Sequence, residues 1–408
     1  MYDLISYGQM IADKTRTDAY ARALRSVINA DSVVLDIGSG TGLFALLACR
    51  FGARRVYALE PGDAIAVARE LAQVNGYGDR ISFIQEFSER VTLPEPVDVV
   101  VSDLRGVLPL YEESLQSILD ARHRHLADNG VLIPGCDFLM AALVDAPDLY
   151  EKLVRPWDAS IHGVDMTAAR RFATNVWHNR RVKPEQVLVA PKCWAELDYA
   201  TLVSPHVRGE MTWVAERPGT AHGLSAWFET ELVPGVRFSG APDQPELIYG
   251  SAFFPLSEPV AISEGDRIDV RLRADLVGGA YTWSWNTHVQ AAQPASAIKA
   301  DFKQSTFLAS PMFKAQLNKR AASHRPTLTE GGEIALLTLQ RMREQSSVGQ
   351  IANEIYACFP ARFPRLSSAL GHVGAFSESY SEEDIETANP ATSSGTERSK
   401  AKVNSPHE

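Results

Sequence analysis

Ser32-Val33-Val34-Leu35-Asp36-Ile37-Gly38-Ser39-Gly40-Thr41-Gly42-Leu43-Phe44 joins an apolar run, three glycines and the start of a second apolar run. The first run is typical of a buried parallel strand. The glycines predict a turn whose backbone comes close to a ligand, because glycine has no Cβ. Residues 43–50 then show apolar positions at helical spacing. The segment therefore predicts an α/β domain built on a parallel sheet.

A second strand is predicted over residues 55–59, and it ends on Glu60. An acidic residue at this point, about 20 residues after the glycines, is placed to accept hydrogen bonds from a ribose. The glycine spacing after Asp36 is Gly-x-Gly-x-Gly and not the Gly-x-Gly-x-x-Gly of dinucleotide-binding enzymes. The segment resembles the S-adenosyl-L-methionine site of class I methyltransferases. This resemblance implies a cofactor site formed by Asp36, Gly38, Gly40, Gly42 and Glu60; the alternative is a structural turn in an unrelated α/β protein.

Length and composition restrict the class of protein. A chain of 408 residues with 45% apolar residues predicts two or three domains with sizeable cores. The net charge of −10 argues against a nucleic-acid partner. We expect no membrane span and no signal peptide, because no apolar run is long enough and the N-terminus lacks a basic region. The four cysteines are scattered, which predicts free thiols in the cytoplasm and no metal site.

The N-terminal region predicts one helix over residues 5–27. Residues 6–16 resemble the segment just before the cofactor domain of protein arginine methyltransferases. The resemblance implies that Met10 stacks near the cofactor and that Arg16 pairs with the cofactor carboxylate, a role that suits the planar fork of arginine. A core methionine and a solvated arginine are the alternative.

Two further strands, residues 81–84 and 97–101, are each followed by polar residues. Ser88 and Glu89 align with the pair of residues that contacts the adenine in the family, although a surface glutamate in a loop remains the alternative. Ligands of open α/β sheets bind beyond the carboxyl ends of the strands. Asp103, which follows the fourth strand, is therefore predicted to lie next to the reactive methyl group. The cofactor domain is predicted to cover residues 1–136.

From about residue 138, short strands replace the alternation of strand and helix, which predicts an all-β unit. Residues 157–186 interrupt this unit in the order Trp, Gly-x-Asp-Met and Pro-x-Gln that is found in the arginine methyltransferase family. The resemblance, which covers residues 5 to about 292, implies a β-barrel acceptor domain over 137–292 with a helical arm at 157–186 through which two subunits form a homodimer.

The C-terminal part predicts a small helical module over residues 325–380, with helices near 334–339, 347–352 and 366–376. This module weakly resembles winged-helix modules that bind leader peptides, and a helical cap on the barrel is the alternative. Residues 381–408 are rich in Ser, Glu, Thr and Pro, which predicts a disordered tail.

The predicted acceptor site departs from the family. Two glutamates after the fourth strand bind the guanidinium in arginine methyltransferases, and their positions are Asp103 and Glu112 in this chain. Both are predicted to be catalytic, although Asp103 is one methylene shorter and Arg105 adds positive charge beside the pocket. The family's Thr-His-Trp loop aligns with residues 244–250, which contain neither His nor Trp. The cofactor half therefore matches better than the acceptor half.

These observations predict an S-adenosyl-L-methionine-dependent methyltransferase, with a class I α/β domain, a β-barrel domain and a small helical module. It resembles protein arginine N-methyltransferases, and the expected acceptor is a nitrogen on a peptide or protein. Two alternatives stay open. One is a small-molecule methyltransferase on the same scaffold, and the other is a cofactor-binding docking protein with little catalysis.

Overall fold

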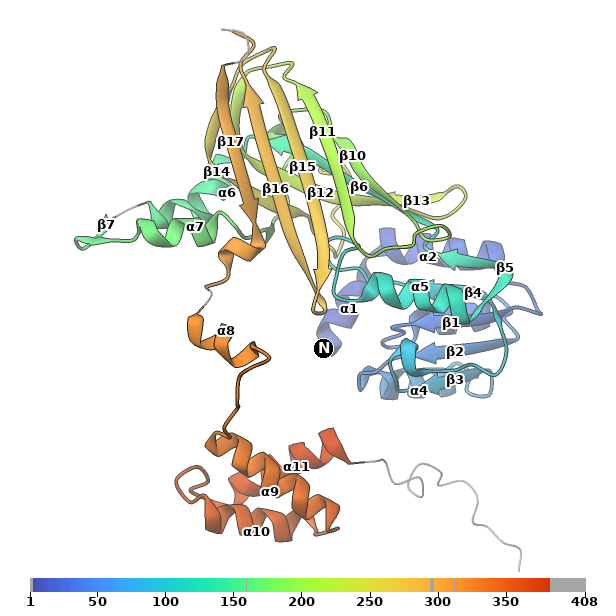
Figure 1. Cartoon of the computed structure of the whole chain (residues 1–408). Helices are drawn as coiled ribbons and strands as arrows, with labels where there is room; N and C mark the ends of the chain where they lie inside the picture. Colours follow the sequence, from blue (N-terminus) through green and yellow to red (C-terminus); the bar gives the residue numbers. More distant parts are fainter. Residues whose placement is uncertain (1–2, 159, 294–296, 312, 382–408) are drawn as a thin grey trace, which may run out of the picture. The chain divides into compact units, whose positions relative to one another are not determined.

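The computed structural model describes residues 3–158, 160–293, 297–311 and 313–381 (Figure 1). The chain forms two compact units, Met1–Pro311 and Met312–Glu408, and each is described by itself. The tail predicted over 381–408 lies, apart from its first residue, outside the described residues.

An α/β domain opens the first unit. Its five parallel strands follow the order β3-β2-β1-β4-β5, as expected for an open doubly wound sheet. The fold class predicted from the sequence is confirmed. The elements of this domain are α1 (Leu4–Ala12), α2 (Lys14–Val27), β1 (Val33–Ile37), α3 (Leu43–Arg50), β2 (Arg55–Leu59), α4 (Ala64–Val74), β3 (Ile81–Ile84), β4 (Val97–Ser102), α5 (Ser114–Arg124) and β5 (Leu126–Ile133).

The prediction of a single helix over residues 5–27 is wrong, because the helix is interrupted at Asp13, between α1 and α2. Asp13 has an extended backbone with φ −68° and ψ 93°, and its side chain accepts a hydrogen bond from the backbone N–H of Arg16 at 3.1 Å. Aspartate is a favoured N-cap residue because it satisfies an amide that has no partner within the helix. This cap starts a new helix and fixes the position of Arg16 in its first turn.

The barrel domain follows. Its strands are β6 (Cys136–Val144), β9 (His178–Asn179), β10 (Lys192–Asp198), β11 (Val207–Val214), β12 (Gly219–Val233), β13 (Val236–Ser239), β14 (Ala252–Ile262), β15 (Arg267–Val277), β16 (Ala280–Gln290) and β17 (Ile298–Ser305). They form one antiparallel sheet in the order β10-β6-β12-β14-β9, with β13 paired to β12, and a second in the order β11-β15-β16-β17. The predicted domain boundaries stay a prediction, although β17 adds a paired strand beyond residue 292.

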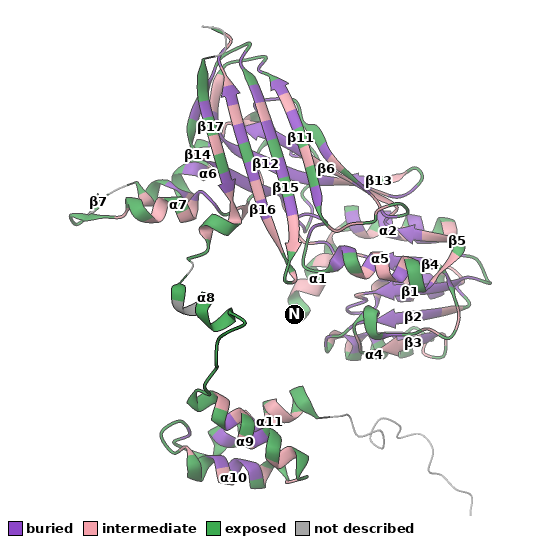
Figure 2. Cartoon of the chain, in the orientation of Figure 1, coloured by how far each residue is buried: buried purple, intermediate pink, exposed green. Residues whose placement is uncertain are grey.

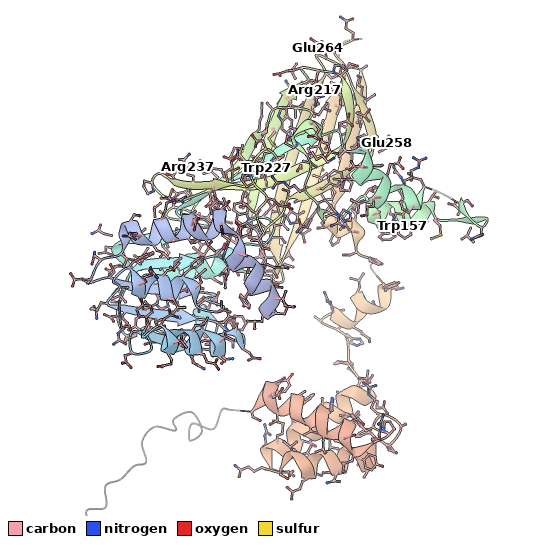
Figure 3. The ribbon with its side chains drawn as sticks, turned by 180° about the vertical axis from the view of Figure 1, so that it is seen from behind. Trp157, Arg217, Trp227, Arg237, Glu258 and Glu264 are labelled. Atoms are coloured by element: carbon pink, nitrogen blue, oxygen red, sulfur yellow. The ribbon has the colours of Figure 1, made fainter. Side chains whose placement is uncertain are left out.

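The two antiparallel sheets enclose a common core. β10 contacts β11, and β14 contacts β17, so the edges of the two sheets meet. Buried and exposed residues alternate along β15 and β16, as expected for strands with one face toward a core (Figure 2). Seen from behind, Arg217 and Glu264 lie at the end of the barrel remote from the α/β domain, whereas Arg237 lies at the nearer end (Figure 3). β13 contacts α2 there, which joins the barrel to the α/β domain.

The arm (residues 157–186) projects from the barrel after α6 (Pro147–Leu153), with Trp157 at its start (Figure 3). It contains a hairpin of β7 (Ser160–Ile161) and β8 (Val164–Asp165), followed by the one-turn helix α7 (Arg170–Ala173). Trp177 packs back on the barrel, with its ring 6.4 Å from that of Phe254. Val164 in the hairpin is 59% exposed and therefore available to a partner surface.

The second unit is helical in its described residues, 313–381, which contain no strand. It comprises α8 (Lys314–Arg320), α9 (Glu330–Arg343), α10 (Val348–Cys358) and α11 (Leu366–Tyr380). Ser347 caps α10 in a capping box with Gln350, which places the helix start where the sequence predicted it. The wing of a winged-helix module is thus not found among these residues. The core of the unit consists of Ile334, Ile351, Ala352, Ile355, Phe363, Ala369 and Val373.

No helix in the described parts of the chain combines the length and the apolar character that crossing a membrane requires.

Candidate functional site

The turn after β1 has the backbone conformation expected from its glycines. The φ angles of Gly38, Gly40 and Gly42 are 68°, 52° and 81°. A Cβ on Gly38 would lie 2.3 Å from Cδ2 of Leu104, and a Cβ on Gly40 would lie 2.4 Å from Cε1 of Tyr7. The turn is therefore closely covered by α1 and by the loop after β4, and a larger side chain would displace one of these segments.

Glu60 lies against this turn, directly after β2. Its Oε2 accepts a hydrogen bond from the backbone N–H of Gly40 at 2.9 Å, and its Oε1 accepts one from that of Gly62 at 2.8 Å. The residue is 7% exposed. A carboxylate offers about four lone-pair positions, so each oxygen of Glu60 keeps the capacity to accept a ligand donor.

Asp36, at the end of β1, holds the start of α3. Its Oδ2 accepts a hydrogen bond from the backbone N–H of Ala45 at 3.0 Å. Its Oδ1 is buried and has no partner among the described residues. Burial raises the pKa of Asp36 to about 7, and the nearby charge of Glu60 adds to this effect. A buried acceptor without a donor is unfavourable by itself, which is the condition that a bound ligand relieves.

Arg16 in α2 is turned toward the fourth strand. Its Nε lies 2.5 Å from Oδ2 of Asp103 and 3.1 Å from the Tyr249 hydroxyl, and its Nη1 donates to the carbonyl of Met10 at 3.1 Å. The guanidinium also lies over the ring of Phe44 at 5.2 Å. The structure thus places Arg16 against the backbone of Met10, while the predicted roles of both residues toward the cofactor stay predictions. The sequence did not predict that Arg16 pairs with a carboxylate of the protein itself, that of Asp103.

Asp103 follows β4 and is bound by three donors. Its Oδ1 accepts from Nε of Arg105 at 3.0 Å, and its Oδ2 accepts from Arg16 and from the Tyr249 hydroxyl, the latter at 2.6 Å. The side chain is 5% exposed. Burial alone would raise the pKa of Asp103, but Arg16, Arg105 and the Tyr249 hydroxyl hold it below its ordinary value. The carboxylate is therefore ionised and firmly held.

Arg105 lies in a fully buried polar cluster between β4 and the barrel. Its Nη1 donates to Oδ1 of Asp137 at 2.9 Å, and its Nη2 donates to the hydroxyl of Tyr20. Asp137 on β6 also accepts from the Tyr199 hydroxyl at 2.7 Å. Burial alone would lower the pKa of Arg105, but Asp137 and Asp103 raise it well above its ordinary value.

Aromatic rings surround the guanidinium of Arg105. Its Cζ lies 5.0 Å from the ring of Phe228, 5.6 Å from that of Phe238, 5.6 Å from that of Tyr249 and 5.7 Å from that of Tyr20. Guanidinium groups bind aromatic faces, and the interaction is stronger where water is excluded. Arg105 is therefore fixed in position by ion pairs and by packing.

The barrel loop over residues 244–250 reaches the α/β domain. The backbone N–H of Ile248 donates to Oδ2 of Asp13 at 2.9 Å, and Tyr249 binds Asp103. Tyr249 is 7% exposed. The loop that lacks the family's His and Trp therefore still contacts the site, through a tyrosine hydroxyl.

The remaining predicted residues lie outside this cluster. Ser88 is buried, and its carbonyl accepts from Nη2 of Arg124 at 2.8 Å. Glu89 is exposed and accepts a hydrogen bond from the hydroxyl of Ser117. Glu112 is exposed, with φ 44° in the left-handed region, which is uncommon for residues other than glycine. Among the described residues, no partner of Asp103 also binds Glu112, so the structure does not join these two carboxylates.

Sequence reasoning missed Tyr249, Asp137, Tyr20 and Tyr199. Each lies far along the chain from Asp103 or Arg105, and no motif spacing links them. The described residues contain no group of three or more His, Cys, Asp or Glu side chains that could hold a metal ion.

Two family models match adjacent parts of the chain. Residues 15–133 match the model of ribosomal protein L11 methyltransferase, and residues 138–276 match the arginine methyltransferase oligomerization subdomain. Protein arginine N-methyltransferase 6 of Xenopus tropicalis is 30% identical over 284 residues, which cover 65% of this chain and 82% of that protein. The chain belongs to the protein arginine N-methyltransferase family.

For other members of the family, the aligned residues cover a smaller share of the relative's own length. Protein arginine N-methyltransferase 2 of Mus musculus is 32% identical over 284 residues, which cover 64% of this chain and 63% of the mouse protein. The human protein of that name is 31% identical, and 65% of its length is covered. The chain thus spans somewhat less than two thirds of each of these two relatives.

Solved structures of the family share this fold. The Trypanosoma brucei PRMT1 enzyme–prozyme heterotetrameric complex with AdoHcy has a TM-score of 0.68 at 23% identity, over 73% of this chain and 97% of that chain. Protein arginine methyltransferase 10 of Arabidopsis thaliana has a TM-score of 0.65 at 22% identity, over 74% and 97%. At these identities the likeness concerns the fold, so the chemistry of this family member must be argued from its own residues.

Proposed function

We propose that this protein binds S-adenosyl-L-methionine at the glycine turn and transfers the methyl group to a nitrogen of a peptide or protein. The observation that supports this proposal most strongly is the fixed carboxylate of Glu60. It is oriented by the amides of Gly40 and Gly62, directly at the turn after β1. A carboxylate at this position of an α/β sheet suits the two hydroxyls of a ribose.

Asp36 gives independent support for a bound ligand. Its Oδ1 is a buried acceptor without a donor among the described residues, and it lies beside the same glycine turn. Two structural relatives are named with a product-type ligand, AdoHcy in one and SAH in the other. The residues present therefore fit S-adenosyl-L-methionine, which would supply an electrophilic methyl group on a sulfonium.

Asp103 is the group proposed to face the acceptor. It follows β4, the strand next to β1, and ligands bind beyond the carboxyl ends of such strands. Asp103 can accept a hydrogen bond from the acceptor nitrogen and orient its lone pair toward the methyl group. Holding two reactants in line is the main contribution that an enzyme can make to such a displacement.

A homodimer and a cytoplasmic location are also proposed. Residues 138–276 match an oligomerization subdomain, and Val164 of the arm is exposed. The four cysteines are free, which fits a reducing compartment. The acidic net charge of −10 favours neither nucleic acid nor an anionic membrane as a partner.

Isothermal titration calorimetry with S-adenosyl-L-methionine tests the cofactor assignment. We expect binding in the micromolar range, and we expect Glu60→Gln to weaken it about tenfold or more, because a charged acceptor is lost. Glu70→Gln is a matched control, since Glu70 is an exposed acid on α4 of the same domain. Equal affinity for Glu60→Gln and the parent would remove Glu60 from the site, and preference for a nicotinamide dinucleotide would contradict the proposal as a whole.

A further inference from the structure

Two guanidinium groups already bind the carboxylate that faces the proposed acceptor. Nε of Arg16 lies 2.5 Å from Oδ2 of Asp103, and Nε of Arg105 lies 3.0 Å from Oδ1. The Tyr249 hydroxyl donates a further hydrogen bond to Oδ2 at 2.6 Å. Because a carboxylate offers about four lone-pair positions, Asp103 keeps about one for an acceptor. A planar cation that needs two parallel hydrogen bonds cannot obtain them here.

An incoming cation cannot easily displace Arg105 from Asp103. Its side chain is 3% exposed, and its Nη1 is paired with Asp137, whose side chain is 0% exposed. Moving Arg105 away would leave Asp137 as a buried charge with hydroxyl groups, those of Tyr199 and Thr230, but without its paired cation. Breaking such a pair is strongly unfavourable, since the remaining charge has no compensation.

Charge balance leads to the same conclusion. Arg16 and Arg105 carry two positive charges, and Asp103 and Asp137 carry two negative charges, so the cluster is neutral as it stands. Glu112 is exposed and shares no described partner with Asp103, so it is not a member of this cluster. A third cation would meet two like charges at close range and would leave the cluster with a net positive charge, whereas a neutral group would not.

We propose that Arg105 is a specificity-determining residue, which makes this site accept a neutral group that presents a single N–H, such as an imidazole ring, and reject a guanidinium. This inference rests on the proposed methyl transfer, and it names the class of acceptor. The N–H of the acceptor donates to the remaining position on Asp103. The other ring nitrogen, which carries the lone pair and no proton, forms the N–C bond while the C–S bond breaks and the electron pair of that bond stays on sulfur. The ring, now cationic, then releases its N–H proton to water.

Peptide binding tests the inference without requiring turnover. Two peptides that differ only in one residue, arginine or its neutral isostere citrulline, are titrated into the protein with S-adenosylhomocysteine present. The wild type should bind the arginine peptide less than tenfold more tightly than the citrulline peptide. The double variant Arg105→Met/Asp137→Asn keeps the cluster free of unpaired negative charge and releases one oxygen of Asp103. It should prefer the arginine peptide by tenfold or more.

Arg54→Met is the control for loss of an arginine, because Arg54 forms a surface ion pair with Glu95 elsewhere in the domain. It should behave as the wild type does. A tenfold or larger preference of the wild type for the arginine peptide would overturn the inference, and so would a folded double variant without that preference. Denaturant unfolding shows whether the double variant is folded. If it does not unfold cooperatively, the ratio of the arginine-peptide and citrulline-peptide affinities of the wild type decides alone. Failure to bind S-adenosylhomocysteine would instead contradict the proposed function, and the peptide ratio is then measured without it.

Discussion

The hydroxyl of Tyr249 lies 2.6 Å from Oδ2 of Asp103, and this hydrogen bond joins the barrel to the carboxyl end of β4. The two residues are separated by 146 positions in the chain. Nε of Arg16 contacts both of them. The proposed acceptor carboxylate is therefore oriented by the barrel as well as by its own domain, which makes the two domains parts of one site.

Tyr249→Phe should lower the rate of methyl transfer about tenfold, because Asp103 loses one of its three donors and becomes less firmly oriented. Cofactor affinity should stay within about twofold, since Tyr249 binds Asp103 and not the glycine turn. Single-turnover rates with labelled cofactor measure the effect. Tyr281→Phe is the control, because its hydroxyl donates to the carbonyl of Pro205 in the barrel, outside the site. Parental rates in Tyr249→Phe would show that this hydrogen bond has no role in transfer.

Asp103→Asn should lower turnover about a hundredfold while cofactor affinity is kept, because the acceptor loses the carboxylate that orients it toward the methyl group. Glu112→Gln is the matched carboxylate control. Its effect should be threefold or less, because Glu112 is exposed and shares no described partner with Asp103. Both rates are measured with the same acceptor. A parental rate in Asp103→Asn would exclude Asp103 from the chemistry, and a large loss in Glu112→Gln would require a rearranged loop in the complex.

The arrangement of the residues around the glycine turn could be predicted, because these residues are close in sequence and lie on adjacent strands. Asp36, the glycines and Glu60 lie on β1, the turn after it and the end of β2, and parallel pairing of these strands brings them together. The pattern of one apolar strand, a glycine turn and an acidic residue therefore predicts how these residues are arranged in space. The hydrogen bond from Gly40 to Glu60 is the direct consequence.

The acceptor half could not be predicted in the same way. The ion pair of Arg16 with Asp103 spans 87 positions, and the positions of Asp137 and Tyr249 depend on how the barrel packs against α2 and β5. No local pattern encodes such contacts. The break at Asp13 was also missed, since an aspartate within an otherwise helical pattern marks a new helix start only when its side chain caps the next turn.

Asp36 should make the ligand-free protein less stable as the pH rises. Its pKa is about 7 in the folded state and about 3.8 when unperturbed, so the folded state binds more protons between these values. The free energy of unfolding therefore falls with rising pH across this window. Relative to Asp36→Asn, the wild type should lose about 3 kcal/mol between pH 5 and pH 8, at about 1.4 kcal/mol for each pH unit below 7. Denaturant unfolding of both proteins at the two pH values measures this difference, and parallel pH dependences would contradict it.

Val164→Glu should weaken the proposed dimer, because it places a charge on the exposed apolar hairpin of the arm. Val164 is 59% exposed, and Val214 on β11, which is 61% exposed, provides a control of the same chemistry away from the arm. Light scattering over a range of concentrations should give twice the monomer mass for the wild type and for Val214→Glu, and a lower mass for Val164→Glu. Monomer mass for the wild type at every concentration would refute the homodimer.

Methyl transfer itself is tested most directly with S-adenosyl-L-methionine that is labelled in the methyl group. The protein is incubated with this cofactor and a cell extract, and the labelled species are identified by mass spectrometry, with Glu60→Gln as the control. We predict label on a nitrogen of a peptide or protein, and a loss of that label in Glu60→Gln. A protein that binds the cofactor through Glu60 but labels no peptide or protein would contradict the account.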